Sequence, residues 1–191
     1  MKRRPLFLTL AAAAALIAAA GWLRPVLPVD DDKWHSGFDH RFKKHAKHYF
    51  GAHFDWRWFK AQGLAESTLR EHALSNRGAR GVMQILPTTY AEIFQDHSLL
   101  PEITDPKWNI AAGIAYDRYL YERWARRVPP SQRLAFTLGS YNAGFRKISN
   151  ARQQAKSSGQ PSDRWTQVAA YAPGQTRHYV QKIFGLMAEP L

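Results

Sequence analysis

Apolar residues recur at helical spacing through most of this chain, and no segment shows the sustained alternation of apolar and polar residues that is typical of a β-strand. The segment DPKWNIAAGIAYDRYLYERW, which Asp105 and Pro106 open, places Ile110, Asp117 and Trp124 at helical intervals. Because this spacing favours helices and the strand signal is missing, we expect a mainly α fold, in which any sheet is a small hairpin.

Local signals also predict where several helices begin and end. Phe42 and Ala46 belong to the apolar face of a helix over residues 38–50, whose histidines and lysines are expected to face solvent. Pro87 can open a helix at its first position, and Gly144 ends the helix that contains SQRLAFTLGSYNA. A last amphipathic helix is expected over QTRHYVQKIFGLM.

The helix that follows Asp55, a favourable N-cap, carries the first candidate catalytic residue. Its predicted apolar stripe consists of Trp58, Ala61, Ala65 and Leu69. Glu66 lies one residue beyond Ala65, about 100° around the helix, and therefore at the edge of the buried face. The following segment contains Gly78 and Gly81, which permit close backbone approach or positive φ.

The N-terminal region predicts transport out of the cytoplasm. A positively charged MKRR start precedes the uncharged residues 5–23, whose length is near that of a membrane span. A cleaved signal peptide and an uncleaved anchor in the inner membrane both remain open. Residues 24–34, with two prolines and three aspartates, are expected to be a linker, and residues 35–191 a single domain in the periplasm or cell envelope.

Charge and composition narrow the classes of partner and of chemistry. The formal net charge of +12 favours an anionic partner, and export argues against nucleic acid, which leaves wall polymers and membrane surfaces. The absence of cysteine excludes disulfides and a thiol nucleophile. His45 and His48 are spaced three residues apart, but without an HExxH motif an exposed basic face explains them better. We therefore expect no metal and no cofactor.

Several ordered motifs resemble one family of enzymes. They are Glu66-Ser67, Ser75, GARGVMQILPTT from Gly78, NIAAGIAYDRYL from Asn109, and SYNAG from Ser140. Together they resemble the catalytic domain of family 1 lytic transglycosylases, which are similar to the soluble lytic transglycosylase and cleave peptidoglycan. The segments FDWRWFKAQGLAES and RWTQVAAY are most similar to the membrane-bound murein transglycosylase F branch. The resemblance spans roughly residues 38–183.

This resemblance implies a lysozyme-like helical domain with a glycan-binding cleft, in which Glu66 is the catalytic acid and base. It also implies a set of substrate-binding positions near Glu66, namely Ser75, Met83, Gln84, Tyr141 and Asn142. Two features depart from the family. Gln175 stands where many members have glutamate, and only about 30 residues precede the catalytic part, so the large N-terminal domain of the F branch is expected to be absent.

The implied reaction needs one carboxyl group where ordinary glycosidases use two. No motif places a second acid opposite Glu66, and in the family reaction the substrate's own C6 hydroxyl attacks C1 and forms a 1,6-anhydromuramoyl end. Glu66 then needs a raised pKa, which desolvation beside Met83 and Leu86 can supply. We expect Tyr141 to hydrogen-bond the carboxyl group, and the nearby arginines, Arg70 and Arg80, to point away from it.

Two other functions remain open from the sequence. A goose-type lysozyme would hydrolyse the same bond with a positioned water, and it would leave reducing muramic acid ends. A wall-binding assembly factor would bind peptidoglycan without cleaving it, although the presence of both Glu66 and Tyr141 argues against this function. The expected partner in all three cases is the glycan strand of peptidoglycan, and the sequence does not indicate an oligomeric state.

Overall fold

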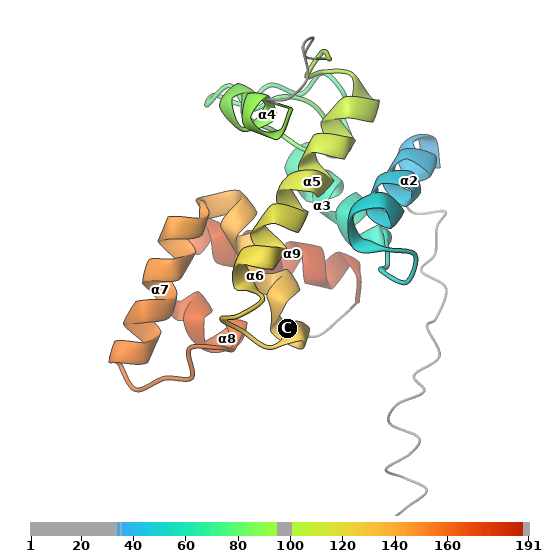
Figure 1. The fold of residues 1–191 in the computed structure, drawn as a ribbon. Helices are drawn as coiled ribbons and strands as arrows, with labels where there is room; N and C mark the ends of the chain where they lie inside the picture. Colours follow the sequence, from blue (N-terminus) through green and yellow to red (C-terminus); the bar gives the residue numbers. More distant parts are fainter. Residues whose placement is uncertain (1–33, 35, 95–100, 189–191) are drawn as a thin grey trace, which may run out of the picture. The chain divides into compact units, whose positions relative to one another are not determined.

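The computed structural model describes residues 34, 36–94 and 101–188, and the chain divides into two compact units, Met1–Ser36 and Gly37–Leu191. The second unit is helical (Figure 1). Its α-helices are α2 (Asp39–Phe50), α3 (Arg57–Ser67), α4 (Pro87–Ile93), α5 (Pro106–Trp124), α6 (Pro130–Ala143), α7 (Phe145–Ser157), α8 (Trp165–Val168) and α9 (Gly174–Leu186). Two 3₁₀ turns are η2 (Ser36–Phe38) and η3 (Ala169–Tyr171).

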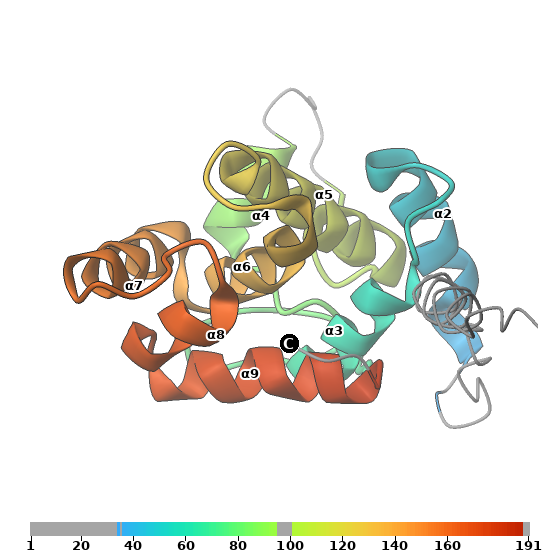
Figure 2. The ribbon, with the colours of Figure 1, turned by 90° about the horizontal axis from the view of Figure 1, so that it is seen from below.

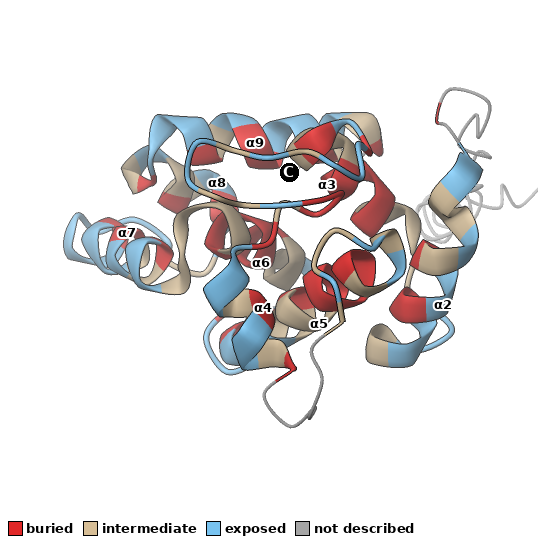
Figure 3. Cartoon of the chain, turned by 90° about the horizontal axis from the view of Figure 1, so that it is seen from above, coloured by how far each residue is buried: buried red, intermediate tan, exposed pale blue. Residues whose placement is uncertain are grey.

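Helix α5 is central to the second unit and packs against α2, α4 and α6 (Figure 1). Helix α9 lies along α3 and α6, as the view from below shows (Figure 2). Its outer side is exposed, whereas the side toward α3 and α6 is buried (Figure 3). Helices α3, α6 and α9 are therefore held together although α9 comes more than a hundred residues after α3 in the sequence.

The predicted helix ends are confirmed where proline and glycine mark them. Pro87 and Pro106 occupy the first turns of α4 and α5, and Asp105 caps α5 by accepting a hydrogen bond from the backbone N–H of Lys107 at 2.8 Å. Gly144 ends α6 with a φ of +89°, a conformation that side chains disfavour. The mainly α fold is also confirmed, since the described residues contain isolated β-bridges and no strand.

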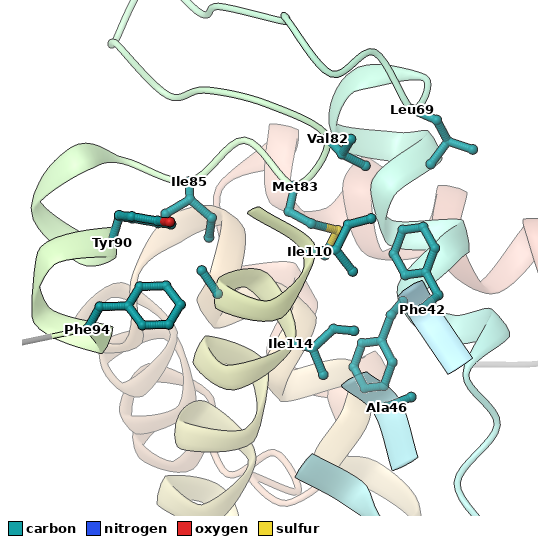
Figure 4. Close-up of a cluster of buried hydrophobic side chains, with 12 residues drawn as sticks. Phe42, Ala46, Leu69, Val82, Met83, Ile85, Tyr90, Phe94, Ile110 and Ile114 are labelled. Carbon is teal, nitrogen blue, oxygen red and sulfur yellow. The ribbon is translucent and has the colours of Figure 1, made fainter. Parts of the chain in front are cut away.

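The hydrophobic core joins α2 and α5 to the loop that precedes α4 (Figure 4). Phe42 from α2 and Ile110 and Ile114 from α5 meet Val82 and Met83 from this loop, and all five side chains are fully buried. Packing of this kind stabilises the native state by roughly 1.5–3 kcal/mol per large apolar side chain. The loop is thus part of the core rather than a mobile surface connection.

Two helical glycines allow close packing in the interior of the domain. A Cβ atom at Gly113 of α5 would lie 2.7 Å from Cβ of Met83, and one at Gly139 of α6 would lie 2.5 Å from the ring of Trp165. Both distances are shorter than van der Waals contact, so a larger residue would displace its neighbour. The glycines therefore set how deeply Met83 and Trp165 can be buried.

Hydrogen bonds from buried side chains fix the backbone of residues 80–83. Asn109 of α5 donates through Nδ2 to the carbonyls of Arg80 and Ile103, at 2.9 and 2.8 Å, and its Oδ1 accepts from the N–H of Met83 at 2.7 Å. Ser67, at the end of α3, donates to the carbonyl of Val82 at 2.8 Å. Arg80 and Gly81 also bond to the backbone of neighbouring loop residues, and these side chains tie the loop to two helices.

The predicted apolar stripe of α3 is only partly correct. Trp58 and Ala65 are half-buried, while Phe59 and Gln62 are buried. The physical reason is that α2 and α9 cover α3 on separate sides, so more than one face of α3 is buried. Even Lys60 is fully buried, and its ammonium group lies 2.6 Å from a carboxylate oxygen of Asp39 on α2.

Two further features differ from the sequence expectations. His45 was expected to face solvent on α2, but it is buried, and desolvation lowers its pKa to about 4. Helices α7 and α8 were not predicted. The apolar residues of α7, Phe145, Ile148, Ala151 and Ala155, do recur at helical spacing, whereas the four residues of α8 are too few to show a period. Asp55 does accept a hydrogen bond from the N–H of Arg57 at 3.0 Å, although α3 starts two residues later.

The predicted export segment, residues 1–23, lies outside the described residues, as does the predicted linker except for Trp34. Within the part that is described, no helix combines the length and the hydropathy needed to cross a bilayer.

We predict that Asn109→Ala destabilises the protein by about 3 kcal/mol, because buried backbone groups lose their partners. Urea denaturation followed by circular dichroism measures the change. The matched control is Asn150→Ala on the exposed surface of α7, which should change the free energy of unfolding by less than about 0.5 kcal/mol. Equal effects of the two substitutions would contradict the role of Asn109 in holding the loop.

Candidate active site

A cleft of about 550 Å³ opens beside the last turn of α3. Its walls come from helices α3, α4, α5 and α6, from the loop before α4, and from the first turn of α9. The polar residues that line it include Glu66, Ser75, Gln84, Tyr141, Asn142 and Gln175. Glu66 is the one acidic residue among the described residues that line this cleft. The structure therefore brings together five of the six predicted site residues.

Tyr179 on α9 holds the carboxyl group of Glu66. The hydroxyl of Tyr179 donates to Oε1 of Glu66 at 2.6 Å, across 113 positions of sequence. Tyr141, which we expected in this role, instead donates to the carbonyl of Met83 at 2.8 Å. Tyr141 thus adds a third helix to the set that fixes the loop, while its ring still lines the cleft.

Burial shifts the acid–base behaviour of Glu66. Desolvation raises the pKa of Glu66 from 4.5 to about 7, against the opposing effects of the Tyr179 hydrogen bond and of the positive charge of Lys182. Arg70 and Arg80 are exposed, as expected from the sequence. A carboxyl group with this pKa can both give and take a proton near neutral pH.

Ser75 and Gln84 line the cleft and also hold its loop in shape. Oγ of Ser75 accepts hydrogen bonds from the N–H groups of Arg77 and Ala79, at 3.3 and 3.0 Å. Nε2 of Gln84, whose φ is +47°, donates to the carbonyls of Ala73 and Gly81 at 3.1 and 3.0 Å. Among the described residues these contacts leave the Ser75 hydroxyl hydrogen and the Gln84 carbonyl oxygen for a ligand.

Met83 and Asn142 have different surroundings. The side chain of Met83 was expected to line the cleft, but it is fully buried against Gly113, because the loop turns it into the core. The Met83 backbone instead helps to hold the loop, because its carbonyl accepts from Tyr141 and its N–H donates to Asn109. Asn142 does line the cleft, and its Oδ1 accepts from the hydroxyl of Thr176 on α9 at 2.8 Å, which orients the amide N–H groups.

Sequence reasoning missed Tyr179, although a signal for it exists. Thr176, Tyr179, Val180 and Ile183 form the buried face of α9 at intervals of three and four residues. A tyrosine on such a face needs an acceptor for its hydroxyl group. The pattern could have indicated that Tyr179 has a buried partner, but the identity of that partner depends on how α9 packs against α3.

The described residues contain no group of three or more histidine, cysteine, aspartate or glutamate side chains that could hold a metal ion. The polar groups that line the cleft are mainly amides and hydroxyls, together with one carboxyl group and the guanidinium group of Arg77. This donor set matches sugars, whose hydroxyl and N-acetyl groups both donate and accept hydrogen bonds.

Comparison of the fold with solved structures finds lytic transglycosylases. The 70 kDa soluble lytic transglycosylase from Escherichia coli is similar with a TM-score of 0.64 and 23% identity, over 93% of this chain and 27% of that chain. An inactive mutant of the lytic transglycosylase Slt from Pseudomonas aeruginosa, with glutamine in place of a glutamate, is similar with a TM-score of 0.65 and 20% identity, over 92% of this chain and 29% of that chain.

Comparison of the sequence points to the same group of proteins. The membrane-bound lytic murein transglycosylase F of Marinobacter nauticus is 36% identical over 133 residues, which are 69% of this chain and 26% of that protein. The chain therefore matches only about a quarter of the length of this relative. The sequence profile of the transglycosylase SLT domain matches residues 51–163, which include Glu66 and more than half of the chain. On this match, the chain belongs to the transglycosylase SLT domain family.

Proposed function

We propose that this protein is a lytic transglycosylase that cleaves the β-1,4 bond between N-acetylmuramic acid and N-acetylglucosamine in peptidoglycan. The observation that carries this proposal is the single acid of the cleft, Glu66, with a pKa of about 7 and a hydrogen bond from Tyr179. Membership of the transglycosylase SLT domain family supports it, as does the activity named for the relatives.

The proposed reaction has two proton transfers, and Glu66 makes both. Protonated Glu66 gives its proton to the glycosidic oxygen as the bond from that oxygen to C1 of the muramic acid breaks, helped by the neighbouring acetamido group. The Glu66 carboxylate then takes the proton of the C6 hydroxyl, whose oxygen bonds to C1 and closes the 1,6-anhydro ring. No water is consumed, and Glu66 ends the cycle protonated.

The remaining cleft residues suit a glycan of this kind. We assign the amides of Gln84, Asn142 and Gln175 to the N-acetyl groups. The carbonyl oxygen of Gln84 can accept from an acetamido N–H, and the N–H groups of Asn142 can donate to an acetamido carbonyl, while the amide of Gln175 can do both. Arg77 can pair with the carboxylates of the lactyl group or of stem peptides. The formal net charge of +12 favours the same anionic wall.

We further propose that the protein acts in the cell envelope, with everything after residue 23 outside the cytoplasm. The MKRR start followed by the uncharged residues 5–23 supports this location, and so does the description of the Marinobacter relative as membrane-bound. Residues 5–23 either anchor the protein in the inner membrane or are removed as a signal peptide.

We predict that Glu66→Gln keeps its fold and loses at least about 100-fold of its activity on purified sacculi, because an amide cannot transfer the proton. Mass spectrometry of the products measures the yield of 1,6-anhydromuramoyl ends. The matched control, Glu71→Gln, alters an exposed carboxyl group and should leave the activity unchanged. Reducing muramic acid ends from the wild-type protein would support the goose-type lysozyme instead, and the absence of cleavage would support a wall-binding factor.

We predict that turnover falls as the pH rises through about 7, because only protonated Glu66 can donate to the leaving oxygen. In Tyr179→Phe the midpoint of this fall should move to higher pH, since the lost hydrogen bond stabilises the carboxylate. The maximal rate should also fall by about tenfold, the effect of one lost hydrogen bond of about 1.4 kcal/mol. Tyr171→Phe, on η3 outside the cleft, is the control. An unchanged midpoint in Tyr179→Phe would contradict the assigned role.

We predict that Glu66→Gln is more stable than the wild type at alkaline pH and equally stable at acidic pH. In the unfolded chain Glu66 ionises near 4.5, whereas in the folded protein it ionises near 7, so the wild type loses stability as the pH rises between these values. The expected gain above pH 7 is on the order of 3 kcal/mol. Urea denaturation of both proteins at several pH values measures it, and a difference that does not vary with pH would refute the shift.

A further inference from the structure

A second carboxyl group, which the proposed reaction does not use, lies behind the cleft. Asp117 of α5 is fully buried and is not one of the cleft-lining residues. It is close enough to Glu66 for the two carboxyl groups to influence each other electrostatically. The charge on Asp117 therefore affects how readily Glu66 ionises.

The hydrogen bonds around Asp117 indicate its protonation state. Nε2 of Gln62, on α3, donates to Oδ1 of Asp117 at 3.3 Å. Two oxygens of this pair, Oδ2 of Asp117 and Oε1 of Gln62, are buried without a hydrogen-bond partner among the described residues. Both orphaned atoms are acceptors when Asp117 is ionised, so they cannot satisfy each other. A single proton on Oδ2 gives Asp117 a donor for Oε1 of Gln62 and satisfies both oxygens.

The surrounding charges favour the same protonation state. The titratable groups that interact with Asp117 are Glu66 from α3, Tyr116 from α5, Tyr141 from α6 and Tyr179 from α9, all of which are acids. Among the described residues no cation forms an ion pair with Asp117, whereas Lys182 acts on Glu66. Burial, the largest effect, raises the pKa of Asp117 well above its ordinary value.

We propose that Asp117 is a neutral carboxylic acid that forms a two-hydrogen-bond ring with the amide of Gln62 and thereby positions the turn of α3 that carries Glu66. Gln62 precedes Glu66 by four residues, so both lie on nearly the same face of α3. The pair therefore joins α3 to α5 directly below Glu66. Asp117 is a positioning residue, since it lies outside the cleft lining and takes no part in either proton transfer.

A neutral Asp117 favours the proposed proton transfer by Glu66, and this part of the inference rests on the proposed function. Glu66 must become a carboxylate once it has given its proton to the leaving oxygen. A second negative charge behind it would oppose that step, and a neutral Asp117 avoids the repulsion. The two carboxyl groups thus differ in protonation state. Glu66 has a hydroxyl donor and a nearby lysine that stabilise its carboxylate, whereas Asp117 pairs with an amide.

Carbon NMR of the side-chain carboxyl groups in the purified full chain tests the protonation state directly. Asp117→Asn and Glu66→Gln assign the two signals by their disappearance. We expect the Asp117 signal to stay at the position of a protonated acid across the range around pH 7 in which Glu66 titrates. An Asp117 signal that shows ionisation at or below the pKa of Glu66 would overturn the proposal. This readout needs no substrate, so it holds even if the proposed reaction fails on sacculi.

Two substitutions test the positioning role. Asp117→Leu removes both hydrogen bonds and orphans the Gln62 amide, so we expect turnover to fall by about tenfold. Asp117→Asn should recover most of the loss, because its Oδ1 accepts from Gln62 and its Nδ2 donates to Gln62, as in the protonated aspartate. The pH midpoint of turnover should stay unchanged in Asp117→Asn. A midpoint shifted to lower pH would show that a negative charge had been removed, and it would refute the neutral acid even if Asp117→Leu fails to fold.

Discussion

The cleft depends on a short stretch of loop backbone, residues 80–83, which side chains from three helices hold. Ser67 of α3, Asn109 of α5 and Tyr141 of α6 each bond to a carbonyl or N–H of this stretch. Arg80 and Gly81 also bond to the backbone of neighbouring loop residues, whereas these side chains are the partners of the Val82 carbonyl and of the Met83 N–H and carbonyl. The same stretch carries Val82 and Met83 into the core and leads to Gln84 at the cleft wall.

Helix α3 is packed against other helices on more than one side, and yet several of its inward-facing side chains are polar. It is covered by α2 and α9, and yet it carries Lys60, Gln62, Glu66 and Ser67, four polar side chains at buried or half-buried positions. Each has a partner from a different part of the fold, so the partly polar interior of the domain is stabilised by long-range pairs. The exception is the electrostatic cost of ionising Glu66, which Tyr179 and Lys182 compensate only in part. The remaining cost raises the pKa to about 7, so that a protonated fraction is available as a proton donor near neutral pH.

Glu66 and Asp117 lie close together, but their different hydrogen-bond partners suit them to different roles. Tyr179 donates to Glu66 and Lys182 adds a positive charge, so its ionised form is accessible. Asp117 receives one amide N–H and has no cation beside it among the described residues, which favours its neutral form. The two acids also differ in their position, because Glu66 lines the cleft and Asp117 does not. Their environments therefore suit proton transfer at one acid and structural pairing at the other.

The sequence by itself determined the features that depend on local interactions. Periodicity predicted α5, α6 and α9, and proline and glycine predicted the start of α5 and the end of α6, because helix formation and helix ends are governed by residues a few positions apart. Glu66 could be singled out because its place at the edge of a helix face and its order among the motifs are both properties of the linear chain. Helix α7 escaped prediction although its apolar residues recur at intervals of three and four, and α8 did so because four residues are too few to show a period.

Only the tertiary structure decided which side chains meet. Tyr179 rather than Tyr141 reaches Glu66, because α9 packs along α3 across 113 positions of sequence. Met83 enters the core because Gly113 leaves room for it on α5. Asp117, whose helical spacing is that of a core residue, is tolerated there because Gln62 comes from the neighbouring helix. Such partnerships depend on the distances between helices, and no pattern within a single segment encodes those distances.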